Sequence, residues 1–197
     1  AGDDAVGTSN MGRRISGTKC ILILADGTPT VDGEADLVSM DSDGFTVNWS
    51  DAPASGYQIH YYAMGGTEIT AAAGLFTGSA STGNQSVTGP GFLPDFLMLS
   101  APGVTAADSN SATFNVMLGM ATGPGERGVA NMADRDAVTP TQSNKVLDTA
   151  RVFRLLSAAT GASSFLADFV SFDPTGFTIN WTTTAGVQEI GYLAIKG

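Results

Sequence analysis

The residue types that carry most enzyme chemistry are scarce in this chain. His60 is the only histidine and Cys20 the only cysteine among 197 residues. A zinc site needs three or four His or Cys ligands, so zinc is excluded. A Ser-His-Asp or Cys-His relay would have to use His60, which lies in an aromatic stretch and is predicted to be structural or interfacial. Cys20 begins an apolar run, and we expect it to be a buried structural thiol.

The carboxylates form no pattern that identifies a catalytic or metal site. Residues 41–44, Asp-Ser-Asp-Gly, resemble the start of a calcium loop, but the twelfth position, which needs Glu, is Ala52. Asp32, Glu34 and Asp36 alternate as residues of one strand face do, which indicates a solvated face. A glycosidase pair of carboxylates stays open as a minor alternative. The glycine clusters lack the Lys-Ser/Thr ending of a phosphate loop. We expect no catalytic residue, no metal and no cofactor.

Tyrosines mark another candidate site. Residues 57–64 are predicted to form a strand with Tyr57 and Tyr61 on one face and Tyr62 on the other. Exposed aromatic rings can stack on sugars, as in lectins, or can pack in a protein interface. Interface packing is the prediction, and sugar binding is the alternative.

An internal repeat organises the chain. Residues 37–49, LVSMDSDGFTVNW, recur as residues 169–181, FVSFDPTGFTINW, with eight of thirteen positions identical at an offset of 132. Each copy alternates apolar and polar residues after an Asp-x-x-Gly turn, which predicts a β-hairpin. The large aromatic residues of the repeat are predicted core anchors: Phe45, Trp49, Phe177 and Trp181.

The repeat extends unequally. Residues 61–66 match residues 192–197, and a weaker match at an offset of 121 relates Gly7, Asn10, Met11 and Arg14 to Gly128, Asn131, Met132 and Arg135. We therefore expect a complete second unit at residues 67–197 and an incomplete first unit at residues 1–66, which lacks the counterpart of residues 67–127. The first unit would borrow strands from a neighbour, share one sandwich with the second unit, or have lost an upstream portion. The edge left open is predicted to be an assembly surface.

The fold class is predicted to be all-β, a β-sandwich or jelly-roll of two related units. No segment has helical periodicity, and 25 glycines suit many short strands with tight turns. Residues 1–19 are predicted to be a flexible arm and residues 133–150 a long polar excursion, both candidate contact arms. The other predicted strands fall at residues 20–25, 35–40, 45–50, 75–77, 84–88, 95–100, 112–121, 129–132, 151–156, 165–171, 177–182 and 187–196.

Charge and hydropathy exclude two classes of partner. The formal net charge is −10, and such an acidic surface repels phosphate backbones. No apolar run approaches the 18–20 residues needed to cross a bilayer. We therefore expect neither a nucleic acid nor a membrane as partner.

Three motifs together suggest a family. The order Gly91-Phe92-Leu93-Pro94-Asp95 before an apolar strand, then Gly-Phe-Thr-x-Asn-Trp, then Tyr-x-Ala-x-x-Gly resembles virion structural proteins of tailed bacteriophages. The resemblance covers most of the chain. It implies a tandem β-sandwich unit that decorates the capsid or forms part of a tail or fibre, with no catalytic residues.

The function expected from these features is a structural assembly protein of a virus particle, not an enzyme. Its partners would be other virion proteins or copies of itself in a homo-oligomer. The alternatives are a carbohydrate-binding module and a subunit of a cell-surface filament or adhesin, both extracellular. The predicted interface residues are Tyr57, Tyr61, Tyr62, Leu193 and Ile195.

Overall fold

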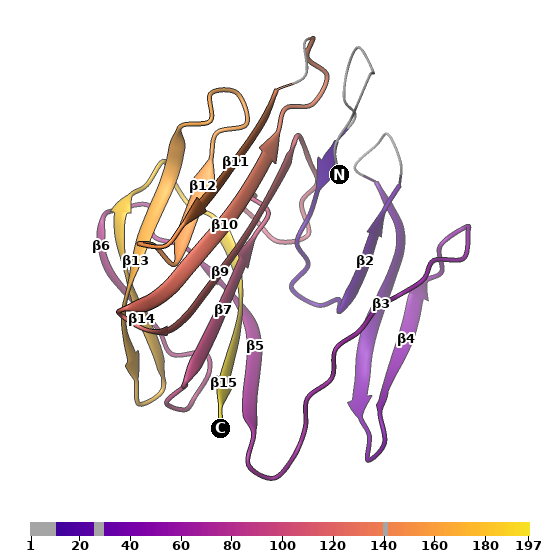
Figure 1. The fold of residues 1–197 in the computed structure, drawn as a ribbon. Coiled ribbons are helices and arrows are strands. Elements are labelled where there is room, and N and C mark those ends of the chain that lie inside the picture. The colour runs from indigo at the N-terminus through magenta and orange to yellow at the C-terminus, as the bar shows by residue number, and fades with distance from the viewer. Residues whose placement is uncertain (1–10, 26–29, 140–141) are drawn as a thin grey trace.

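A computed structural model describes residues 11–25, 30–139 and 142–197 of the chain. All regular structure among these residues is β-strand, and the strands form several antiparallel sheets packed together. This confirms the predicted all-β, sandwich-like fold. Two sheets pack face to face as a sandwich, and a smaller sheet stands beside them (Figure 1).

One sheet of the sandwich has six strands, in the order β11-β10-β9-β7-β15-β5. The other sheet has four strands, in the order β12-β13-β14-β6. The bounds in the six-stranded sheet are β5 Thr70–Thr77, β7 Phe96–Ala101, β9 Phe114–Gly123, β10 Glu126–Asp134, β11 Ser143–Asp148 and β15 Glu189–Lys196. Those in the four-stranded sheet are β6 Gly83–Val87, β12 Phe153–Leu156, β13 Ser163–Asp173 and β14 Gly176–Thr183.

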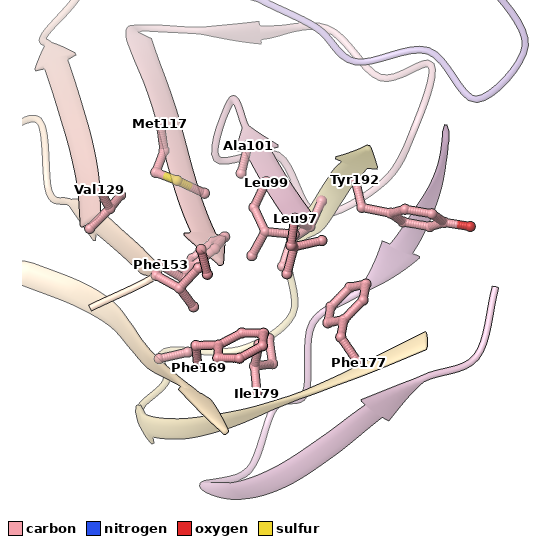
Figure 2. Close-up of a cluster of buried hydrophobic side chains, with 14 of the residues drawn as sticks. Leu97, Leu99, Ala101, Met117, Val129, Phe153, Phe169, Phe177, Ile179 and Tyr192 are labelled. Atoms are coloured by element: carbon pink, nitrogen blue, oxygen red, sulfur yellow. The ribbon is translucent and has the colours of Figure 1, made fainter. Parts of the chain in front are cut away.

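The core lies between these two sheets, where apolar side chains of alternate positions meet (Figure 2). Leu97 and Leu99 of β7 face Phe177 and Ile179 of β14, and all four side chains are fully buried. Trp181 contacts Phe153 edge to face, with ring centroids 5.0 Å apart. Aromatic pairs of this geometry stabilise a core beyond their buried area.

The smaller sheet, called the three-stranded sheet below, has the order β2-β3-β4, with β2 Ile21–Leu24, β3 Val31–Met40 and β4 Phe45–Asp51. It shares no ladder with the sandwich strands among the described residues. The chain between β4 and β5 runs through the space between the two bodies (Figure 1). A short pair, β1 Gly12–Arg13 with β8 Ser111–Ala112, ties the N-terminal segment to the sandwich.

The repeat is reproduced in the backbone, pair by pair. The ladder β2-β3-β4 matches β12-β13-β14 at the offset of 132, so that Ala35 opposite Trp49 corresponds to Ala167 opposite Trp181. The register shifts match as well, including the one that falls after Leu37 in β3 and after Phe169 in β13. A bulge bends and twists its strand, so the two hairpins share their curvature as well as their sequence.

Two predictions of local structure are wrong. Residues 57–64 form no strand, because no neighbouring strand pairs with them, although their counterpart β15 lies between β7 and β5. Residues 133–150 are not a long excursion, because β11 pairs there with β10 as an edge strand. The polar and charged residues of β11 suited a loop, but they also suit a strand with one solvated face.

The weaker match at the offset of 121 has no structural counterpart. Gly7 and Asn10 lie outside the described residues. Met11 and Arg14 flank β1, which pairs with β8, whereas Met132 lies within the β10 ladder. The match over residues 11–14 is therefore not a structural repeat.

Candidate assembly surface

The inner face of the three-stranded sheet, formed by Leu37, Met40, Phe45, Val47 and Trp49, is apolar and only partly covered. Trp49 is 38% exposed, whereas its repeat counterpart Trp181 is 1% exposed. Phe45 is only partly buried, whereas Phe177 is fully buried. The prediction that Phe177 and Trp181 are core anchors holds, and the same prediction is wrong for Phe45 and Trp49. The reason is physical: the sandwich has a second sheet over this face, and the three-stranded sheet has none.

The same contrast holds along β2 and β3. Leu37 is 50% exposed, against 4% for its counterpart Phe169. Cys20 is exposed, whereas its counterpart Val152 is fully buried. The predicted burial of Cys20 is therefore wrong, for the same reason. Leu37 and Cys20 are thus residues of types common in protein cores, but they are exposed here.

The outer edge of β4 is open. In the sandwich, the corresponding edge of β14 pairs with β6, and Phe177 lies opposite Val87 and Trp181 opposite Gly83. No strand of the described residues pairs with that side of β4. An open edge presents backbone donors and acceptors to another chain.

A groove of about 410 Å³ lies between the three-stranded sheet and the sandwich. The segment 57–64 forms part of its wall, and the Phe45 ring contacts Tyr61 edge to face within it. The groove is mostly apolar, and its lining includes Leu37, Met40, Val47, His60, Tyr62 and Leu193.

Three of the five predicted interface residues, Tyr61, Tyr62 and Leu193, line this groove, whereas Tyr57 and Ile195 do not. Tyr61 and Tyr62 are 73% and 85% exposed and line it. Tyr57 is exposed and donates from its hydroxyl to Asp32 at 3.2 Å. Leu193 lines the groove from β15, and Ile195 lies half-buried on the same outer face. His60 lines the groove too, which fits its predicted interfacial role.

A second apolar surface was not identified from the sequence. On β9, Asn115, Met117, Gly119 and Ala121 point toward the core, so the more apolar alternate positions point outward. The outer face of β9, β10 and β11 therefore exposes Val116, Leu118, Met120, Met132 and Leu147. The signal was present, because residues 112–121 have an obvious apolar face. The sequence does not show which face of β9 the four-stranded sheet covers.

The turn carboxylate Asp41 has a structural role. Its two oxygens accept hydrogen bonds from the hydroxyls of Ser39 and Thr46, each at 2.7 Å. The hydrogen bonds from Ser39 and then Thr46 lower the pKa of Asp41. Asp173 accepts the equivalent bonds from Ser171 and Thr178, at 2.8 and 2.6 Å. Both copies thus use the carboxylate to close the hairpin, as expected of a plain turn.

One lysine pairs with two of the three carboxylates on the acidic face of β3. Lys19 Nζ lies 3.1 Å from a carboxylate oxygen of Asp36 and 3.5 Å from one of Glu34. The hydrogen bond to Asp36 is the main cause that raises the pKa of Lys19. Among the described residues, no group of three His, Cys, Asp or Glu side chains is arranged to hold a metal ion. Within the same residues, no helix could span a bilayer.

Comparison with known proteins gives no relative. No family model, no curated protein and no solved structure matches the chain.

Proposed function

We propose that this protein is a structural assembly protein that acts through subunit contacts and performs no catalysis. One observation carries the proposal: the inner face of the three-stranded sheet repeats the apolar pattern of the sandwich core, with Phe45 and Trp49 in the places of Phe177 and Trp181, and much of it is exposed. Leu37, Met40 and Trp49 are all exposed on it. Covering a large apolar side chain is worth about 1.5–3 kcal/mol. A partner that covers the sheet would therefore gain substantial free energy.

The outer face of the six-stranded sheet supports the same proposal. Exposed apolar patches on soluble proteins mark interaction surfaces. Two separate surfaces allow one subunit to contact more than one neighbour, and heterologous contacts of this kind build rings or filaments. The resemblance of the sequence motifs to virion proteins of tailed phages is the basis for proposing that this assembly belongs to a virus particle, as a capsid decoration or a tail or fibre component.

The test is the mass of the full chain in solution, measured by light scattering over a range of concentrations. We expect the mass to exceed that of the 20.1 kDa chain. Leu37→Glu should lower it by placing a charge on the uncovered face. Ser109→Glu adds the same charge in an exposed loop and is the matched control. A chain that stays monomeric at every concentration, alone and with purified virion proteins, would contradict the proposal.

Carbohydrate binding is the second candidate, favoured by the exposure of Tyr61 and Tyr62. It predicts that a glycan binds the monomer and that this binding is lost in the Tyr61→Ala and Tyr62→Ala variants. A glycan array with both variants separates it from assembly. Electron microscopy of the assembled chain distinguishes closed particles from the head-to-tail filaments of a cell-surface subunit.

A further inference from the structure

We infer that the three-stranded sheet is half of a sandwich that a neighbouring subunit completes, with a strand pairing antiparallel along β4 in the register that β6 adopts on β14. This inference rests on the proposed assembly function and names the partner segment. The segment is a front half of the same repeat, with the chemistry of residues 67–127.

The first support is a difference in surroundings between the two equivalent turn glycines, Gly44 and Gly176. A Cβ on Gly176 would collide with the backbone carbonyl oxygen of Val87, at the end of β6. Gly44 is its repeat counterpart, and a Cβ there would meet nothing within 4 Å. The positive-φ residues of the structure do not include Gly44. A strand that lies over Gly44 as β6 lies over Gly176 would require a glycine at this position as well.

The second support is the polar chemistry of the β6–β14 contact. Trp181 donates from Nε1 to the side-chain oxygen of Gln85 at 2.7 Å. The hydroxyl of Ser86 lies 2.7 Å from that of Thr178. The counterparts in the three-stranded sheet are Trp49 and Thr46. The completing strand therefore carries an amide side chain that accepts from Trp49 Nε1 and a hydroxyl opposite Thr46.

The third support is the segment 57–64, which matches β15 but has no strands to join. In the sandwich β15 pairs with β7 on one side and with β5 on the other. Two strands from the partner would flank residues 57–64 in the same way. The groove beside this segment is the space that such strands would enter.

The described residues offer no covering strand of their own, because the sandwich strands are paired in their own sheets and the chain just before β2 is held elsewhere. At the offset of 132, residues 11–16 correspond to β11 of the sandwich. β11 lies in the sheet that faces β12, β13 and β14, but residues 11–16 do not face the three-stranded sheet in this way, since β1 pairs with β8 and Arg13 donates to the Thr113 hydroxyl at 2.7 Å. Arg14 donates to Asn110 at 3.0 Å. This segment of the chain therefore does not cover the sheet.

The experiment supplies the missing half as a tethered probe. A second copy of residues 67–127 is joined ahead of residue 1 of the full chain through a flexible glycine-serine linker no longer than the span requires, which gives an effective concentration of about millimolar. The Cys20 thiol and Trp49 report on the covered face. We expect the labelling rate of Cys20 to fall at least about tenfold, as for a site reached only by local opening. Trp49 emission should shift to shorter wavelength.

Two variants separate completion from unspecific contact. Gly44→Ala fits the open space of the native chain, so it should leave that chain folded, and it should abolish both changes in the fusion.

Cysteine placed at Asn48 and at the Asn84 position of the tethered copy, in a Cys20→Ser background, should form a disulfide in high yield. Asn180 pairs with Asn84 in the sandwich, whereas Gln85 pairs with Ile179. A cysteine at the Gln85 position is therefore the register control.

The outcomes are distinguishable from those of the proposed function. A fusion in which Cys20 and Trp49 stay as exposed as in the native chain overturns the inference. The inference is also overturned if the fusion that carries Gly44→Ala protects Cys20 and Trp49 as well as the unsubstituted fusion does. Equal disulfide yields from cysteine at the Asn84 and Gln85 positions would overturn it too. If the native chain assembles while the fusion stays open, the completion is wrong and the assembly function stands. If the native chain never assembles, the proposed function fails whatever the fusion does.

Discussion

Phe45 and Tyr61 reproduce a core contact outside a core. Their ring centroids lie 4.9 Å apart at an interplanar angle of 76°. Their counterparts Phe177 and Tyr192 are 6.0 Å apart at 67° inside the sandwich. The same pair thus occurs once beneath a second sheet and once beside an open groove. The chain contains its own matched control for the effect of covering a β-sheet.

Truncation of the two phenylalanines should separate a covered site from an uncovered one. Phe177→Ala removes a fully buried ring and should lower the free energy of unfolding by about 3–5 kcal/mol. Phe45→Ala should cost about 1 kcal/mol or less, because water already reaches its site. Urea unfolding followed by Trp181 emission in a Trp49→Phe background measures the loss at Phe177, and Trp49 emission in a Trp181→Phe background measures the loss at Phe45. Equal losses would contradict the difference in cover.

The two tryptophans should differ in the same direction. The chain has only two, so Trp49→Phe and Trp181→Phe each leave a single reporter. Trp49 should emit at longer wavelength and be quenched readily by acrylamide, since 38% of it is exposed. Trp181 should resist the quencher. Quenching that is equally weak for both residues in a dilute, monomeric sample would show that the inner face is covered within one chain.

The hairpins could be predicted from the sequence because their determinants are local. The turn from Asp41 to Gly44 and the alternation over 45–49 define a strand pair without reference to the rest of the chain. The repeat also indicated that the first unit lacks strands. That inference needed only the comparison of two segments of one sequence.

Burial could not be predicted, because it depends on what lies across from a residue. Trp49 and Trp181 stand in the same local sequence, and only the second has a sheet above it. The strand prediction for residues 57–64 failed for the same reason, since a strand needs neighbours to satisfy its backbone. Which face of β9 enters the core could not be predicted, because both of its faces carry apolar residues.

The carboxylate of Asp41 should make the three-stranded sheet sensitive to acid. Its hydrogen bonds lower the folded pKa below the ordinary 3.8. A lowered folded pKa stabilises the folded state above the unfolded pKa, and this stabilisation is lost as the pH falls through the folded value. Asp41→Asn should therefore flatten the loss of structure below about pH 4. Trp49 emission in a Trp181→Phe background, followed from pH 6 to pH 2, measures the effect.

The control for this titration is Asp43→Asn in the same turn. Among the described residues Asp43 accepts no side-chain hydrogen bond, so its substitution should leave the acid transition in place. A transition that is unchanged in Asp41→Asn would show that the two hydroxyl hydrogen bonds do not govern the acid response of the hairpin.

Amide hydrogen exchange should distinguish residues 57–64 from β15. The amides of β15 are held in ladders on both sides, with β7 and with β5. Their exchange should require opening of the sandwich and should be slow. Residues 57–64 have the matching sequence but no ladder, so their amides should exchange within seconds in a dilute sample.

If assembly converts residues 57–64 into a strand, their amides should become protected at high concentration while the exchange of β15 stays unchanged. Strong protection of residues 57–64 in the dilute monomer would mean that the segment already pairs within one chain, and the groove would then be closed rather than open to a partner.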